Sequence, residues 1–272
     1  MGLMAMVSVP SIATVDDTNA VHYYVSLGDS LAASVQPNGE DTYGYAEQLY
    51  ASLVAADPKL ELVKLGCGGE STVSMRFGSQ DPTIVLSCGT PRYYKHVLYP
   101  KGTQLAEAVS FLQAHKDKVA LVTIDIGAND LFRLDVQGNE VTCLFKPAGC
   151  ATQTARIVEN LSAILADLRA AAGADVPIVA MSYYDVFAPV CVSDPSQLFV
   201  CSRVDDFNAT LVDTYAVAGD PIADVAGTFE NENLVNCAAH VCNWTWFCAL
   251  GDIHANTAGY GVIARAFEQV LP

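Results

Sequence analysis

Residues 21–30 read VHYYVSLGDS. The apolar, β-rich run 21–27 stops at a glycine, which predicts a buried strand followed by a tight turn. Ligands of open α/β sheets bind at the carboxyl ends of the strands, so this turn would hold Ser30 where a nucleophile is useful. Gly-Asp and Asp-Ser pairs also form ordinary turns. The rest of the chain therefore decides whether Ser30 is more than a turn residue.

Apolar β-type runs alternate with amphipathic helical stretches along the chain. The pattern predicts strands at 21–27, 60–65, 119–126, 176–181 and 221–225. It predicts helices at 43–56, 104–115, 155–172, 204–218 and 256–271, and an irregular, cysteine-bearing segment at 182–202. Such alternation is typical of a parallel sheet with helices on both faces. We expect one domain with a three-layer α/β/α, flavodoxin-like fold around a central, mainly parallel five-stranded sheet.

Composition limits the possible functions. The chain has 272 residues, 51% of them hydrophobic, which is enough to bury a full core. It carries 14 Lys and Arg against 30 Asp and Glu, a net charge of -16. Such a field does not attract phosphate backbones or anionic lipid, so we expect no nucleic-acid partner.

The first residues are typical of export. Residues 1–13 are apolar and uncharged and end in Ser11-Ile12-Ala13, small residues that suit signal peptidase. A positively charged start is missing, so 1–20 is either a signal-peptide remnant or an unstructured leader, before a domain at 21–272. No other segment has the uncharged length needed to span a bilayer. We expect a secreted protein without stable membrane insertion.

Nine cysteines cluster in short loops. Near-neighbour pairing gives Cys67 with Cys88, Cys143 with Cys150, Cys191 with Cys201, and Cys242 with Cys248, which leaves Cys237 free. Zinc is the alternative, but two close Cys-x-x-Cys pairs are lacking, so we favour disulfides and expect no metal. Spacing does not determine connectivity, and the partner of Cys237 stays open.

Three more polar motifs lie in loops that would gather at the carboxyl edge of the sheet. The glycines of loop 65–72 permit backbone amides to turn toward a ligand. Gly127-Ala128-Asn129-Asp130 follows a strand and offers a side-chain amide to an oxyanion. Gly251-Asp252-Ile253-His254 precedes the last helix and offers an imidazole beside a carboxylate. Each motif alone is equally well explained by a turn or a helix cap.

In this order and spacing, the four segments together resemble the GDSL or SGNH hydrolase superfamily. The family's blocks match Gly28-Asp29-Ser30-Leu31, the Gly69 loop, Gly127-Ala128-Asn129-Asp130 and Asp252-Ile253-His254. The Cys67 loop and the segments 123–130 and 244–248 look like a branch of secreted bacterial GDSL lipases and esterases.

The resemblance implies a role for each matched residue. Ser30 would be the nucleophile, and His254 the base that takes its proton and later protonates the leaving alkoxide. The amides of Ser30 and Gly69 and the side chain of Asn129 would form the oxyanion hole. The reaction would pass through an acyl-enzyme and need no cofactor.

One departure concerns the third member of the catalytic set. The family usually separates the acid and the histidine by two residues, whereas here only Ile253 separates Asp252 from His254, and Gly251 takes the usual acid position. Either Asp252 or a backbone carbonyl near Gly251 would orient the imidazole. We favour Asp252 because a carboxylate also stabilises the imidazolium that forms during catalysis.

The sequence says less about the substrate. Segment 183–200 is either an apolar wall for an acyl chain or a crossover loop that buries its own hydrophobic residues, which is the commoner case. We expect a monomeric esterase or lipase acting on small-molecule or lipid esters with short to medium acyl chains. The alternatives are a carbohydrate O-deacetylase or acetyltransferase with the same catalytic set, and a noncatalytic secreted binding protein.

Overall fold

The computed structural model describes residues 20–39, 41–78, 99–131, 144 and 150–271. Residues 1–19 of the expected leader lie outside this part, as do Cys88 and Cys143. The division into a leader and a domain therefore stays a prediction. Within the described ranges, no helix combines the length and the apolar character needed to cross a membrane.

Five parallel strands form one sheet in the order β2-β1-β3-β4-β5. They are β1 (His22–Gly28), β2 (Leu60–Lys64), β3 (Val119–Asp125), β4 (Ile178–Met181) and β5 (Ile222–Ala223). All seven residues of β3 are buried, which is typical of a parallel strand covered on both faces. The predicted fold class is confirmed, and each predicted strand is present at its expected place.

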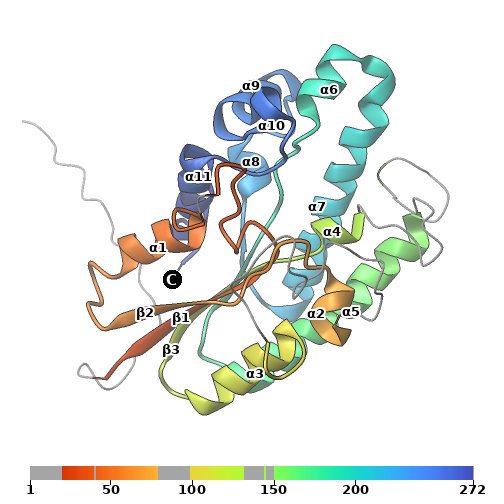
Figure 1. Ribbon diagram of the computed structural model, residues 1–272. Helices are drawn as coiled ribbons and strands as arrows, with labels where there is room; N and C mark the ends of the chain where they lie inside the picture. Colours follow the sequence, from red (N-terminus) through yellow and green to blue (C-terminus); the bar gives the residue numbers. More distant parts are fainter. Residues whose placement is uncertain (1–19, 40, 79–98, 132–143, 145–149, 272) are drawn as a thin grey trace, which may run out of the picture.

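Helices cover both faces of the sheet (Figure 1). One face carries α1 (Tyr45–Leu53) and α11 (Thr257–Glu268), which pack on each other. The other carries α3 (Gln104–Ala114), α5 (Cys150–Ala172) and α7 (Leu198–Ala218). The remaining helices are α2 (Thr72–Phe77), α4 (Ala128–Leu131), α6 (Ala188–Ser193), the 3-10 helix Pro195–Gln197, α8 (Val225–Thr228), α9 (Leu234–Trp244) and α10 (Phe247–Leu250).

The expectation of an irregular segment at 182–202 is wrong in part. This stretch contains α6 and the 3-10 helix, and α7 begins at Leu198 rather than at residue 204. A disulfide joins Cys191 of α6 to Cys201 in the first turns of α7. The disulfide ties α6 to α7. Because α6 has only six residues, it is too short to show a helical period of apolar residues in the sequence.

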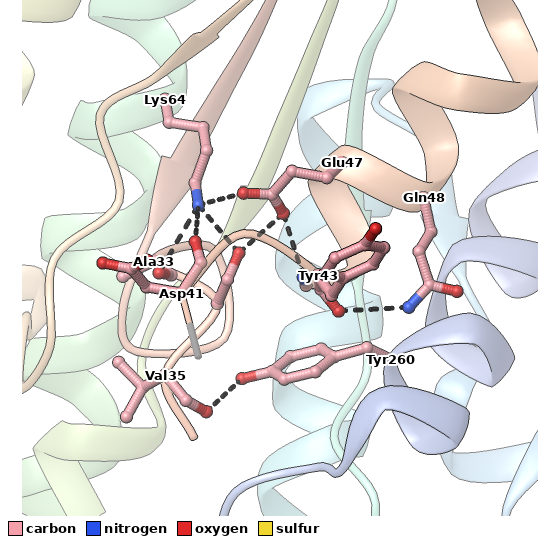
Figure 2. A network of polar contacts seen from close by, with 10 residues as sticks. Ala33, Val35, Asp41, Tyr43, Glu47, Gln48, Lys64 and Tyr260 are labelled. Atoms are coloured by element: carbon pink, nitrogen blue, oxygen red, sulfur yellow. Dashed lines mark hydrogen bonds and ion pairs between the residues drawn. The ribbon is translucent and has the colours of Figure 1, made fainter. Parts of the chain in front are cut away.

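The loop between β1 and α1 is built around Lys64 of β2 (Figure 2). The Lys64 ammonium donates to the Ser34 hydroxyl at 2.8 Å and to the Asp41 and Ala33 carbonyl oxygens at 3.0 and 3.5 Å, and it pairs with the Glu47 carboxylate. Ser34 in turn donates to Glu47 at 2.7 Å. One cation thus fixes the path of the loop that follows Ser30.

The same loop is tied to the C-terminal part of the chain. The Tyr260 hydroxyl of α11 donates to the Val35 carbonyl oxygen at 2.8 Å (Figure 2). The indole N–H of Trp246 donates to the Gln36 side chain at 3.3 Å. Two segments that are far apart in the sequence therefore keep a fixed relation at the carboxyl edge of the sheet.

Candidate active site

Ser30 follows a turn that only glycine can begin. Gly28 ends β1 with φ at +135°, and a Cβ there would lie 2.2 Å from the Asp125 carbonyl oxygen. The backbone N–H of Asp29 donates to that same oxygen at 3.0 Å. The turn leaves Ser30 half-buried while its neighbours Asp29 and Leu31 are buried.

A pocket opens at this edge of the sheet, and Ser30, Asn129 and His254 all line it. The other lining residues are mainly apolar or aromatic, Leu31, Leu131, Val186, Phe187 and Phe207 among them. The structure thus brings together three of the sequence-predicted site residues. Within the described residues, no hydrogen bond joins the Ser30 hydroxyl to His254, a contact that is often loose until substrate binds.

The His254 imidazole is held by the residue two positions before it. Asp252 Oδ1 lies 2.7 Å from His254 Nδ1 and accepts the His254 backbone N–H at 2.9 Å. The hydrogen bond from His254 holds the pKa of the Asp252 carboxyl below its usual range. A proton on Nδ1 facing Asp252 leaves the Nε2 lone pair as the basic position. Asp252 can reach the imidazole across a single intervening residue because its carboxylate bonds both the backbone N–H and Nδ1 of His254.

Backbone hydrogen bonds attach the segment that carries His254 to the residues between α9 and α10. Trp246 donates its backbone N–H to the His254 carbonyl oxygen at 3.0 Å, and Thr245 forms an isolated antiparallel bridge with Ala255. A disulfide between Cys242 and Cys248 cross-links the chain just before this segment. The imidazole is therefore presented from a braced loop.

Asn129 lies in α4 and reaches the loop that contains Gly69. Its Nδ2 donates to the Glu70 carbonyl oxygen at 2.9 Å, which uses one of its two amide protons. Gly69 adopts φ of +78° but is not among the residues that line the pocket. Among the described residues, the backbone N–H groups of Ser30 and Gly69 donate to no other protein group. One Asn129 proton and these two amides are therefore left for a ligand.

Glu70 and Gln104 connect the Gly69 loop to the end of β1. The Gln104 side chain accepts the Gly28 N–H at 2.7 Å and donates to the Gly28 carbonyl oxygen at 3.0 Å, as a neighbouring strand would. Its Nε2 also lies 3.2 Å from Glu70 Oε2. Burial, followed by the charges of Asp29 and Asp130, raises the pKa of Glu70 to about 7. Sequence reasoning missed both residues, because a glutamine at a helix start carries no signal of such a contact.

A pair of buried carboxyls lies beneath Ser30. Asp125 accepts the Tyr45 hydroxyl at 2.6 Å, and Asp29 accepts the Leu31 N–H at 2.9 Å. Burial raises the pKa of Asp125 well above its usual range, and the adjacent Asp29 charge raises it further. Burial and mutual repulsion therefore disfavour a negative charge on both carboxyls at once.

Two of the expected short disulfide loops lie within the described residues. The disulfides Cys191–Cys201 and Cys242–Cys248 are present, and Cys67 is disulfide-bonded. Its expected partner Cys88, together with Cys143 and the side chain of Cys150, lies outside the described residues. Cys237 is a buried free thiol, and burial raises its pKa to about 12. Asp185 lies beside Cys191 and Cys201, but a disulfide cannot supply thiolate ligands to a metal.

Segment 183–200 combines the two roles that the sequence left open. Tyr183, Tyr184, Val186 and Phe187 line the pocket. The later part, with Cys191 and Val200, packs into a small apolar cluster of its own.

Comparison with known proteins places this arrangement in a family. Similar solved structures include the acetylxylan esterase Axe2 from Geobacillus stearothermophilus, with a TM-score of 0.55 and 17% identity over 92% of this chain and 94% of that one. The lipase Lip_vut3 from a goat rumen metagenome has a TM-score of 0.59 and 15% identity over 92% and 97%. A member of the lipolytic G-D-S-L family from Veillonella parvula has a TM-score of 0.52 and 13% identity over 92% of this chain and 98% of that one. No protein with a curated description matches the sequence.

These identities are low and show the fold alone. The GDSL-like lipase/acylhydrolase family matches residues 26–262, a range that contains all four motifs and the whole pocket edge. The chain belongs to the GDSL-like lipase/acylhydrolase family and is a carboxylic ester hydrolase.

Proposed function

We propose that the protein is a secreted serine esterase or lipase that cleaves esters of short to medium acyl chains through an acyl-enzyme. One observation carries the proposal: a single pocket collects Ser30, Asn129 and His254 from distant parts of the chain, and Asp252 holds Nδ1 of the imidazole. The disulfides support secretion, because such bonds persist in oxidising compartments.

Acylation begins at Ser30. His254 Nε2 takes the hydroxyl proton while Ser30 Oγ bonds to the ester carbonyl carbon, and the carbonyl electron pair moves to oxygen. The amides of Ser30 and Gly69 and the remaining proton of Asn129 stabilise this oxyanion. The intermediate then expels the alkoxide, which leaves as the alcohol with the proton from His254. Asp252 stabilises the imidazolium between these two transfers.

Deacylation repeats the sequence with water. His254 takes a proton from water, the hydroxide bonds to the acyl carbon, and Ser30 Oγ leaves with the proton that His254 returns. The acid product and the free serine restore the starting state, so no metal or cofactor enters the proposed reaction.

The pocket walls support an apolar acyl group. Apart from Tyr183 and Tyr184, the polar lining residues are Asp29, Ser30, Asn129 and His254, and the last three belong to the proposed catalytic set. Apolar walls stabilise an acyl chain by removing its surface from water, at about 0.8 kcal/mol for each buried methylene.

The test is a panel of p-nitrophenyl esters from acetate to palmitate, assayed on wild type and Ser30→Ala, with a serine-directed phosphonate as a control. We expect turnover to peak at short to medium chains, and expect both Ser30→Ala and the phosphonate to abolish it. Substantial activity in Ser30→Ala would remove the nucleophile assignment.

A carbohydrate O-deacetylase is the second candidate, because an acetylxylan esterase shares the fold. Acetylated xylo-oligosaccharides belong in the same panel. A clear preference for them over p-nitrophenyl butyrate would favour this candidate, whereas the apolar pocket walls favour the simple ester. Size-exclusion chromatography tests the accompanying expectation of a monomer.

A further inference from the structure

Two consecutive tyrosines follow β4 and reach the two halves of the proposed active site. The Tyr183 hydroxyl donates to Asp29 Oδ2 at 3.0 Å, and the Tyr184 hydroxyl donates to the Ile253 carbonyl oxygen at 2.8 Å. Asp29 directly precedes the proposed nucleophile, and Ile253 directly precedes the proposed base. One dipeptide therefore touches both catalytic segments.

The backbone of this dipeptide is itself clamped. Asn208 of α7 accepts the Tyr183 N–H at 2.8 Å and donates to the Tyr183 carbonyl oxygen at 2.8 Å. Asn231 donates to the same carbonyl oxygen at 3.1 Å and accepts the Asp185 N–H at 3.1 Å. Side-chain amides thus take the place of a neighbouring strand where β4 ends, so the two tyrosines extend from a fixed base.

Both rings are also packed in place. Tyr183 is 6% and Tyr184 7% exposed, although both line the pocket. The Tyr184 ring stacks on Phe229 with centroids 4.6 Å apart, and the Tyr183 ring lies against Phe207 with centroids 5.8 Å apart. The rings face the pocket while their hydroxyls are bonded to protein groups. The hydroxyls therefore serve the protein frame rather than a substrate.

We propose that Tyr183 and Tyr184 are positioning residues that set the separation between Ser30 and His254; this rests on the proposed function. Other hydrogen bonds join the two parts of the chain, from Val35 to Tyr260, from Gln36 to Trp246 and from Gln48 to Thr257, and all of them begin several residues beyond Ser30. The tyrosine pair is the brace on the pocket side. A misplacement of about 1 Å between nucleophile and base costs up to roughly 100-fold in rate, so such a brace controls turnover.

The experiment compares Tyr183→Phe, Tyr184→Phe and the double variant with Tyr24→Phe. Tyr24 is a matched control because it is fully buried and its hydroxyl shares a hydrogen bond with the Thr123 hydroxyl at 2.9 Å, so it contacts neither Asp29 nor Ile253 through that group. Steady-state kinetics with p-nitrophenyl butyrate are normalised to the active sites titrated with the phosphonate. Melting temperatures are measured on the same samples, and activity is assayed well below them.

We expect each single variant at residues 183 and 184 to lower kcat about tenfold with KM within about twofold of wild type. We expect kcat of the double variant to lie within about threefold of kcat of the slower single variant, because the loss of either hydroxyl already displaces Ser30 from His254. Tyr24→Phe should keep wild-type kcat per titrated site.

Three results would overturn the inference: wild-type kcat in both single variants, an equal fall in Tyr24→Phe, or a raised KM with unchanged kcat, which would indicate substrate contact. A double loss equal to the product of the single losses would also count against a shared role. Ser30→Ala distinguishes a failure of the proposed function from a failure of the positioning role. If it is inactive while both phenylalanine variants are normal, the proposed function stands and the positioning role fails; if it is active, both fall.

Discussion

Glu70→Gln should stabilise the protein at neutral and alkaline pH. Glu70 is 1% exposed, and burial raises its pKa from 4.5 to about 7. Below the lower value, the carboxyl holds its proton in both the folded and the unfolded chain. Between the two values only the unfolded chain releases it, so the free energy of unfolding falls as pH rises. Above the folded pKa the loss is complete.

The size of the effect follows from the shift. The difference between 4.5 and about 7 corresponds to about 3 kcal/mol, because one pKa unit is worth about 1.4 kcal/mol. Glutamine resembles the protonated carboxyl in shape and cannot ionise. Its side-chain oxygen can still accept the amide of Gln104, which lies 3.2 Å from Glu70 Oε2. The variant should therefore lack this part of the pH dependence and keep the local contacts.

The assay is urea unfolding of wild type and Glu70→Gln at pH 5, 6, 7, 8 and 9. The stability difference should grow in favour of glutamine by about 3 kcal/mol between pH 5 and pH 9. Glu61→Gln is the matched control, because Glu61 is an exposed glutamate on neighbouring β2 and should show no such growth. A Glu70→Gln difference that stays constant across this range would refute the reasoning.

Four other substitutions or measurements test the site and its frame. Asn129→Ala should lower kcat about 10²–10³-fold with little change in KM, measured with p-nitrophenyl butyrate, because it removes an oxyanion donor. Asp252→Asn should lower kcat about 100-fold by the same assay, less than in a fully buried triad; a near-normal rate would favour a backbone carbonyl as the orienting group. Thiol titration in denaturant should find one free thiol, that of Cys237, and a higher count would contradict four disulfides. Lys64→Met should destabilise the protein by about 3 kcal/mol in thermal unfolding, because it leaves Glu47 without its cation; an unchanged melting temperature would contradict this.

The sheet was predictable because burial on both faces leaves a clear record in sequence. A strand such as β3, with seven buried residues, reads as an unbroken apolar run. The short helices α6 and α10 leave no such record, because six or four residues do not complete two helical turns. Tertiary contacts and cross-links, rather than local preference, hold them in helical form.

The candidate site divides in the same way. Ser30, Asn129 and His254 could be singled out because each belongs to a motif at the end of a strand or before a helix. Asp252 could only be favoured over a backbone carbonyl, since its spacing departs from the family pattern and the folded turn is what brings it to Nδ1. The roles of Gln104 and Tyr183 are long-range contacts across the sheet edge, which no local pattern encodes.

The order of the catalytic segments along the chain has a consequence for how the enzyme is made. Ser30 emerges early from the ribosome, whereas the loop that carries His254 comes after α9 and α10 and just before the last helix. A nascent chain can therefore form most of the sheet and expose its serine without being able to activate it. In the proposed mechanism, esterase activity begins only when synthesis is nearly complete, and products truncated before His254 lack the base and are inert toward esters.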